Sequence, residues 1–341
     1  MLKHPEVKNI GLLTLLYAGT TWLFSFKYSI LNDTVKKLKL WSISAGKIFN
    51  FKKKTSETLN NGIIENFSSG ENIKFISIHV PKHLKPLNDE QFGYYLAGLI
   101  DGDGHFSSKQ QLIIAFHSLD ASLAYNIKER LGYGSVKKVK NKNAILFIIS
   151  SKEGIKKVLN LINGKIRTEN KFNQILDNLL NHPRYIDIKK DQDQGASPKI
   201  DFKLNKDKNL KNHWLAGFSD ADASFQIKIL NRDNRVEVRL NYQIDQKKSN
   251  ILALIKDYLG GNIGYRKDQD SYYYGSTSFG SAKKVINYFD HFHLQSSKHV
   301  NYLKWRKAYI LIQNKNHLNK DGLEKIIRLK NTMNRLSDSI I

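Results

Sequence analysis

Two short stretches of this 341-residue chain carry nearly the same motif, and each ends in two aspartates separated by a single residue. The first reads LAGLIDGDG over residues 96–104, and the second reads LAGFSDADA over residues 215–223. The copies lie about 120 residues apart, which is the length of a small domain. A duplicated unit that supplies one acid per copy, Asp103 and Asp222, predicts a two-fold site with two carboxylates at its centre.

Two unpaired carboxylates held side by side repel each other, and this repulsion raises a pKa. A magnesium ion relieves the repulsion, because it prefers a few carboxylates together with waters and phosphate oxygens. Metal ions that bridge a phosphodiester can activate a water and stabilise the leaving oxygen. A single D-x-D at a helix end is just as typical of a capped turn, but two copies in equivalent places favour the metal site.

The residues ahead of the acids indicate how the carboxylates are positioned. Each stretch is largely apolar and has a small pair in its middle, which includes Gly98 in the first copy and Gly217 in the second. Small residues allow two helix backbones to approach closely. We therefore expect two helices packed side by side, with Asp103 and Asp222 adjacent at their C-terminal ends.

The chain is strongly basic, with 55 lysines and arginines against 31 acids and a net charge of +24. A mild excess of lysine serves solubility, but an excess of this size favours a polyanionic partner, either nucleic acid or an anionic membrane surface. The chain contains no cysteine, which excludes disulfide scaffolds, thiolate zinc sites and cysteine nucleophiles.

The composition along the chain predicts an extension followed by two repeats. Residues 1–85 show no repeat and form an extension of unknown role. The first repeat spans residues 86–188, a polar linker spans 189–209, and the second repeat spans 210–341. Within the extension, the apolar run Ile10–Phe24 is short for a membrane span and predicts a buried helix, with a signal-peptide segment as the alternative. No membrane partner is expected for the core.

Each repeat shows the same order of elements after its motif: a hairpin, a helix that stops at glycine, a second hairpin and a last helix. From the helix onward, these elements are predicted at 122–131, 135–150 and 152–161 in the first repeat, and at 250–259, 262–278 and 281–289 in the second. With the motif helix in front, each repeat reads αββαββα. This order predicts an α+β fold in which each repeat has an antiparallel sheet with helices on one face.

The first hairpin of the second repeat alternates apolar and polar residues, so one face can pack under helices while the other is rich in hydrogen-bonding groups. Such groups read base edges in DNA, although they are also typical of an ordinary solvated face. The candidate DNA-contacting residues here are Gln226, Lys228, Arg235, Glu237, Arg239, Asn241 and Gln243. In the first repeat, Lys137 and Lys140 of the second hairpin suit phosphate contacts.

Over residues 88–320, two such motifs at this spacing in a basic chain resemble the LAGLIDADG homing endonucleases of organellar group I introns, in their single-chain, two-motif form. The resemblance implies two αββαββα units that form a saddle over DNA. It also implies that Asp103 and Asp222 bind the catalytic metal, together with the backbone carbonyls of Gly102 and Ala221.

The resemblance further implies a lysine near the scissile phosphate in each repeat. Lys298 matches this position in the second repeat, and Lys165 is the candidate in the first, with Lys171 as the alternative. Gln246 falls where the family often has a glutamine near the attacking water, and its counterpart in the first repeat is expected near Ser118.

The second motif departs from the family pattern at two positions. Ala223 replaces the closing glycine, and we expect strain there if the backbone needs a positive φ. Ser219 stands where an apolar residue is usual. Neither departure removes an acid, and the first acids of the motifs, Asp101 and Asp220, are expected to serve the helix interface.

These residues lead to the prediction of a site-specific double-strand DNA endonuclease that acts as a monomer with Mg²⁺, for which Mn²⁺ can substitute. The resemblance implies a long target and short 3′ overhangs. An RNA maturase that assists splicing of its own group I intron is the alternative, alone or in addition, and an inactive DNA binder is the third hypothesis. The family's habits predict a mitochondrial location, in the matrix.

Overall fold

The computed structural model describes residues 15–17, 20–22, 75–185, 200–233 and 235–333, and the chain forms two units, residues 1–73 and 74–341. In the described part of the smaller unit, strand β1 (Leu15–Tyr17) pairs antiparallel with β2 (Thr20–Trp22). The buried helix predicted for this region is therefore wrong at these residues, where β-branched and aromatic side chains favour a strand. Within the described ranges, none of the helices combines the length and the apolar character that crossing a membrane requires.

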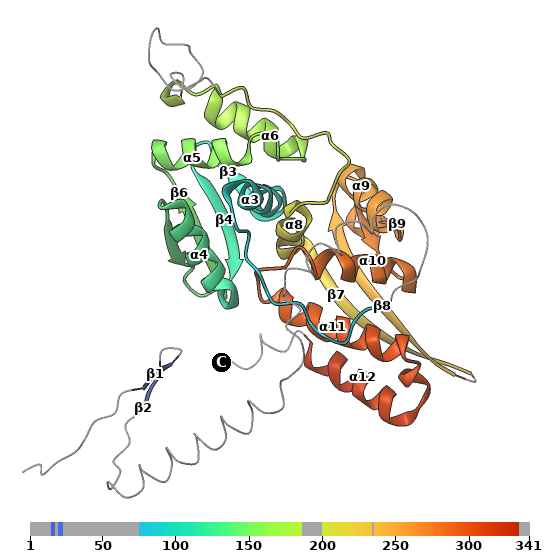
Figure 1. The fold of residues 1–341 in the computed structure, drawn as a ribbon. Helices are drawn as coiled ribbons and strands as arrows, with labels where there is room; N and C mark the ends of the chain where they lie inside the picture. The colour runs from blue at the N-terminus through green and yellow to red at the C-terminus, as the bar shows by residue number, and fades with distance from the viewer. Residues whose placement is uncertain (1–14, 18–19, 23–74, 186–199, 234, 334–341) are drawn as a thin grey trace, which may run out of the picture. The chain divides into compact units, whose positions relative to one another are not determined.

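The larger unit contains both repeats, each in the predicted order (Figure 1). The first repeat consists of α3 (Asp89–Asp103), β3 (Gly104–Phe106), β4 (Leu112–His117), α4 (Ala121–Leu131), β5 (Ser135–Lys138), β6 (Ala144–Ile149) and α5 (Lys152–Ile162). The second consists of α8 (Trp214–Asp222), β7 (Ala223–Arg232), β8 (Arg235–Gln246), α9 (Asn250–Leu259), β9 (Asn262–Arg266), β10 (Ser271–Gly275) and α10 (Phe279–Phe289). Helices α6 (Glu169–Ile175), α11 (Lys298–Gln313) and α12 (Lys320–Thr332) follow the repeats.

Each repeat has one antiparallel four-stranded sheet, with the strand order β3-β4-β6-β5 in the first and β7-β8-β10-β9 in the second. The two orders are equivalent, because in both repeats the first hairpin and the second hairpin join through their second strands. The helices of each repeat cover one face of its sheet. This arrangement confirms the predicted α+β fold of two pseudo-symmetric αββαββα units.

Local sequence signals explain where the helices begin and end. Asn88 caps α3, because its side-chain oxygen accepts a hydrogen bond of 2.9 Å from the amide of Gln91. Helix α4 stops at Gly132, whose φ of 72° is in the left-handed region that glycine adopts without a Cβ penalty. Helix α9 also stops at a glycine with a positive φ, Gly260 at 73°. The equivalent helices of the two repeats therefore both end where the backbone favours glycine.

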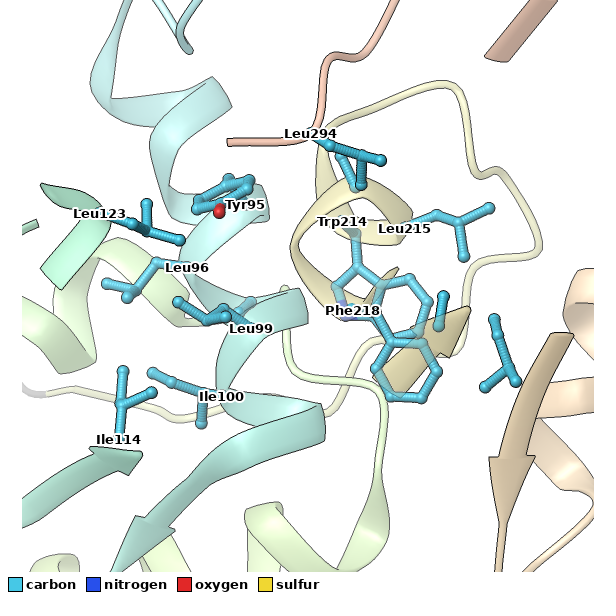
Figure 2. Packing of buried hydrophobic residues seen from close by; sticks show 14 of the residues in the cluster. Tyr95, Leu96, Leu99, Ile100, Ile114, Leu123, Trp214, Leu215, Phe218 and Leu294 are labelled. Atoms are coloured by element: carbon cyan, nitrogen blue, oxygen red, sulfur yellow. The ribbon is translucent and has the colours of Figure 1, made fainter. Parts of the chain in front are cut away.

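The two motif helices, α3 and α8, pack against each other with their backbones in close contact. A Cβ atom at Gly98 would lie 1.9 Å from the carbonyl oxygen of Trp214, and one at Gly217 would lie 1.9 Å from that of Tyr95. Only glycine fits at either position, which confirms the expected role of the small residues. Figure 2 shows the two helices side by side, with Leu96 and Ile100 of α3 on the side turned away from α8, towards Leu123 of α4 and Ile114 of β4.

Two irregular segments join the repeats to each other. Residues 75–87 run along the second repeat, where Ile76 exchanges backbone hydrogen bonds with the side chain of Gln313. Residues 200–209, the described part of the predicted linker, lie along the end of the first repeat, and the amide of Gly164 donates to the carbonyl of Lys203.

Candidate active site

The first acid of each motif is buried and ties the two repeats together. Asp101 accepts hydrogen bonds from the backbone amides of Arg167 and Thr168, at 2.8 and 3.1 Å, and from the Thr168 hydroxyl at 2.6 Å. It also accepts one of 2.8 Å from the indole nitrogen of Trp214, which lies in the other repeat. Burial raises the pKa of Asp101 to about 6, although these donors act against the shift.

Asp220 has the same surroundings in the second repeat. The amides of Gln295 and Ser296 donate to it at 2.7 and 3.2 Å, and the Ser296 hydroxyl donates at 2.5 Å. The hydroxyl of Tyr95, from the first repeat, donates at 2.7 Å. Each first acid therefore accepts from the opposite motif helix, which confirms that Asp101 and Asp220 serve the helix interface.

The second acids, Asp103 and Asp222, lie together at the C-terminal ends of the helix pair. A Cβ atom at Gly102 would be 2.3 Å from the Cβ of Ala221 and 3.1 Å from a carboxylate oxygen of Asp222, so the two helix ends are in contact. Burial and, next to it, the negative charge of Asp103 together raise the pKa of Asp222 to about 6. Burial also raises the pKa of Asp103. The two carboxylates thus interact directly through their charges.

Two lysine side chains reach this acid pair. The ammonium of Lys298 donates to the carbonyl oxygen of Ala221 and, at 3.3 Å, to that of Ser219. The ammonium of Lys171 donates to the carbonyl oxygen of Gly104 at 2.5 Å. Burial lowers the pKa of both lysines, while the nearby aspartates act in the opposite direction.

The structure does not bring Lys165, the candidate from the first repeat, to the acid pair. Its ammonium lies 3.1 Å from Glu90 and over the ring of Tyr94, at the start of α3. Asp103 ends the same helix 13 positions after Glu90, which is about 20 Å along the axis. Lys171, the alternative, is the lysine that the fold places beside the carboxylates.

Gln246 lies at the end of β8 and donates a hydrogen bond of 2.7 Å from its side-chain amide to Asp222. The strand registers define its counterpart, because Ile114 pairs with Gly104 as Ile244 pairs with Ala223. Two residues after Ile114 comes Phe116, which is buried and has no group to donate. The counterpart is thus Phe116 and not a residue near Ser118, and the two acids have different surroundings.

The groups at the helix ends suit a hard divalent cation. All of them are oxygen ligands: the two carboxylates, whose pKa values are raised, and the neighbouring backbone carbonyls of Gly102 and Ala221. A cation would also relieve the repulsion between the two carboxylates. Among the described residues, no cluster of three or more His, Cys, Asp or Glu side chains forms a closed metal site. A cation held here would therefore keep waters or take phosphate oxygens as its remaining ligands.

Comparison with known proteins agrees with this geometry. The family model described as LAGLIDADG endonuclease matches residues 96–180 and 215–309, more than half of the chain. The chain belongs to the LAGLIDADG endonuclease family. This membership accounts for the duplicated motif and for the paired carboxylates.

Two sequence relatives and one solved structure show which LAGLIDADG proteins this chain resembles. It is 64% identical over 328 residues to the cox1 intron-2 37.2 kDa protein of Schizosaccharomyces pombe, covering 93% of this chain and 96% of that one. It is 30% identical to the intron-encoded DNA endonuclease aI3 of Saccharomyces cerevisiae, covering 67% of this chain and 65% of that one. The structure of the I-SmaMI homing endonuclease bound to cleaved DNA matches 75% of this chain and 98% of its own, at 25% identity and a TM-score of 0.55.

The departures of this LAGLIDADG protein from the family motif are accommodated without strain. Ala223 has a φ of −89°, in the extended region, as does Gly104 at −75° in the first motif. The expected strain at Ala223 is therefore absent. The hydroxyl of Ser219 is buried but satisfied, because it bonds at 2.6 Å to the carbonyl of Leu215 and at 2.6 Å to the hydroxyl of Tyr242.

The candidate DNA-contacting residues of the second repeat whose side chains the structure describes lie on the sheet face that points away from the helices. Cross-strand pairs on β7 and β8 place Gln226 beside Asn241 and Lys228 beside Arg239. Asn241 donates to the side-chain oxygens of Gln226 and Gln243, at 3.3 and 3.2 Å. Polar groups on this face are therefore already ordered by one another.

Two other candidates, Glu237 and Arg235, lie near the far end of the long hairpin formed by β7 and β8. Glu237 forms ion pairs with Arg239 at 2.6 Å and with Arg232 at 3.4 Å, so it holds two arginines at the end of the long hairpin. Arg235 lies in β8, but its side chain is outside the described residues. In the first repeat, Lys137 and Lys140 are exposed.

Sequence reasoning did not identify Tyr273 and Arg266, which extend the polar face onto β10 and β9. The Arg266 guanidinium lies 4.8 Å from the centre of the Tyr273 ring and bonds to Asp245 at 2.5 Å. Tyr273 lies flat over Gly264, where a Cβ atom would be 2.4 Å from the ring. The glycine in the middle of a strand was the available signal, since it often marks close approach of another group.

Proposed function

We propose that this protein is a site-specific, metal-dependent endonuclease that cuts both strands of a long DNA duplex. The observation that carries the proposal is the meeting of Asp103 and Asp222, one from each repeat, at the shared end of two packed helices. Two equivalent half-sites facing one such centre suit a duplex, whose strands are related by two-fold symmetry. A single chain that contains both halves acts as a monomer.

In this proposal, Asp103 and Asp222 hold Mg²⁺ together with the carbonyls of Gly102 and Ala221, and Mn²⁺ can substitute. When bound, the metal supplies an activated water and stabilises the leaving oxygen. The chain's own groups do the remaining work. Gln246 orients the Asp222 carboxylate, to which it is hydrogen-bonded at 2.7 Å.

Lys298 and Lys171 are proposed to stabilise negative charge on the phosphate. Both ammonium groups interact electrostatically with Asp103 and Asp222, whose negative charges act to raise the pKa of each lysine. Each now donates to a backbone carbonyl at a helix end, and each can turn to a phosphate oxygen that enters the site. Lys165 is not proposed for this role, because Glu90 pairs with it at the far end of α3.

The sheets are proposed to bind the duplex on either side of this centre, with Gln226, Arg239 and Gln243 reading bases and Lys137 and Lys140 contacting phosphates. A net charge of +24 supports a strong electrostatic component of binding. We expect affinity to fall steeply with salt, because each neutralised phosphate releases counterions.

The test is incubation of the protein and Mg²⁺ with DNA from the intronless form of its host gene. The relative encoded in a cox1 intron makes a cox1 exon junction the first choice. We expect double-strand cleavage by the wild type and none by the Asp103→Asn/Asp222→Asn variant. The matched control is Asp257→Asn, the same change at an exposed acid on α9. Equal cleavage by wild type and double variant contradicts the proposal.

A maturase activity toward its own intron RNA is the second candidate, because one relative is named an RNA maturase. The acid pair separates the two activities, since a maturase needs neither carboxylate. If wild type and the double variant promote splicing equally while neither cuts the intronless DNA, the chain is a maturase and not a nuclease. Specific binding without cutting, in either Mg²⁺ or Mn²⁺, indicates an inactive DNA binder.

The cox1 intron relative also supports a mitochondrial origin, and we propose that the protein acts in the matrix. We further propose that residues 86–188 and 210–341 are the two functional halves, joined by the linker 189–209. Within residues 1–85, the described end, residues 75–85, lies along the second repeat.

A further inference from the structure

The face of the first sheet that points away from its helices is apolar, and we call it the outer face of the first sheet. On its two central strands it consists of Ile113 and Ala115 on β4 and Ala144, Leu146 and Ile148 on β6, with His117 at the end of β4. The residues between them, such as Leu112 and Phe147, are fully buried beneath the helices. The outer residues are partly or fully exposed and do not belong to the hydrophobic core.

The pairing of the strands makes this surface continuous. Ile113 lies beside Ile148, and Ala115 lies beside Leu146. His105 on β3 extends the first row, since it pairs with Ile113. His105 comes two residues after Asp103, so this apolar surface begins next to the acid pair.

The equivalent positions of the second sheet are polar or lack a side chain. The strand registers match Ile113 with Gln243 and Ala115 with Asp245. In the same way, Leu146 corresponds to Tyr273 and Ile148 to Gly275. In the second sheet Gln243 donates to Asp245 at 2.9 Å, whereas the first sheet offers no hydrogen-bonding side chain at the matching pair.

The charged groups around the outer face of the first sheet suit a polyanion such as the duplex of the proposed function. Its two hairpins, residues 104–117 and 135–149, contain no aspartate or glutamate. Lysines border it, and Lys137 pairs across the sheet with Leu146. An apolar centre in hairpins whose charged side chains are all basic fits a duplex whose phosphates meet the lysines while its bases meet the apolar residues.

We propose that the first repeat recognises its half of the DNA target mainly through the 5-methyl groups of thymines in the major groove. Thymine is the base that offers an apolar group there, and aliphatic side chains contact it. The second repeat reads its half by hydrogen bonds. This inference rests on the proposed endonuclease function and specifies the chemistry of one half-site.

The test replaces thymine by deoxyuridine in one half of the cleaved target at a time. Uracil keeps the O4 acceptor and loses only the methyl group. Binding is measured by fluorescence anisotropy without divalent metal, so the duplex stays intact. We expect affinity to fall about fourfold for each contacted methyl in the half under the first repeat, and less than twofold in total in the other half.

A variant assigns the effect to the proposed surface. In Ile148→Ser the deoxyuridine penalty should shrink, because serine has no methyl group with which to contact thymine. Ile327→Ser, the same change at an exposed isoleucine on α12, should retain the full penalty. The wild-type comparison needs no variant, so it stands even if Ile148→Ser folds poorly.

Several results overturn the inference while leaving the endonuclease function intact. They are a cleaved target with no thymine in that half, no deoxyuridine penalty in either half, or an undiminished penalty in Ile148→Ser. Failure of the protein to bind or cut any duplex overturns the proposed function itself, and the inference with it.

Discussion

The hydroxyl of Tyr95 makes a hydrogen bond across the two repeats, and its removal tests how the acid-bearing helices are held. Tyr95 is 1% exposed and donates at 2.7 Å to Asp220, which is also buried. Tyr95→Phe keeps the ring and removes only the donor. Asp220 would retain the backbone amides of Gln295 and Ser296 and the Ser296 hydroxyl.

A hydrogen bond to a charged group contributes about 1.5–3 kcal/mol, and its loss from a buried carboxylate falls in the same range. The three remaining donors limit the cost, so we expect a decrease of about 2 kcal/mol in the free energy of unfolding. For a unit of this size, that corresponds to a decrease in Tm of about 4–8 °C.

The control is Tyr274→Phe, which makes the same chemical change elsewhere in the core. Tyr274 is fully buried, and its hydroxyl has no partner among the described residues. Removing it should therefore cost little or stabilise the protein. Both variants are measured by urea denaturation and by thermal unfolding at neutral pH.

A double-mutant cycle with Asp220→Asn isolates the interaction itself. We expect Tyr95→Phe to cost clearly less in the Asp220→Asn background than in the wild type. If Tyr95→Phe destabilises no more than Tyr274→Phe, or if the cycle shows no coupling, the argument that the first acids join the repeats is refuted.

Three further predictions concern the site, the helix contact and pH. Lys298→Met and Lys171→Met should each slow single-turnover cleavage on the order of 100-fold, while the same change at an exposed lysine of α12 should not. Gly217→Ala should destabilise by about 1–3 kcal/mol or more, since its Cβ would be 1.9 Å from a carbonyl oxygen, whereas Gly280→Ala, with open space around it, should be neutral or stabilising in urea denaturation. Burial lowers the pKa of His293 to about 4, so the unfolded chain takes up a proton below about pH 6.5 while the native state does not. The contribution of His293 to stability should therefore fall by up to about 1.4 kcal/mol per pH unit between pH 6.5 and 4, and His293→Gln should reduce the overall slope.

Much of the fold could be predicted because its signals are local. Helix α4 was expected at 122–131 and spans Ala121–Leu131, ending at the predicted glycine. Helix α10 was expected at 281–289 and starts two residues earlier, at Phe279, because Ser278 is its N-cap. Such boundaries depend on caps and on periodicity, which are both visible in the sequence.

The lysine of the first repeat could not be predicted in the same way. Lys165 follows a helix and a glycine, which suggested it from the sequence. In the structure, however, its side chain lies against the start of α3, beside Glu90 and Gly93. The residue that would have located the correct lysine is the hydroxyl residue bonded to the first acid of each motif. Thr168 and Ser296 bond equivalently to Asp101 and Asp220, and aligning them places Lys171 within one residue of the Lys298 position.

The two repeats are alike in the packed helices that bring the acids together, and they differ in the residues around the second acids, Asp103 and Asp222. Equivalent contacts hold the first acids, and glycines at matching positions set the helix spacing. Around the second acids the likeness ends, since Gln246 donates to Asp222 whereas Phe116 stands at the equivalent position beside Asp103. Symmetry in the helix pair is required to bring two carboxylates together. Beyond it, each half is free to meet a different strand and a different half of an asymmetric duplex, which is how the polar and apolar outer faces of the two sheets can coexist in one chain.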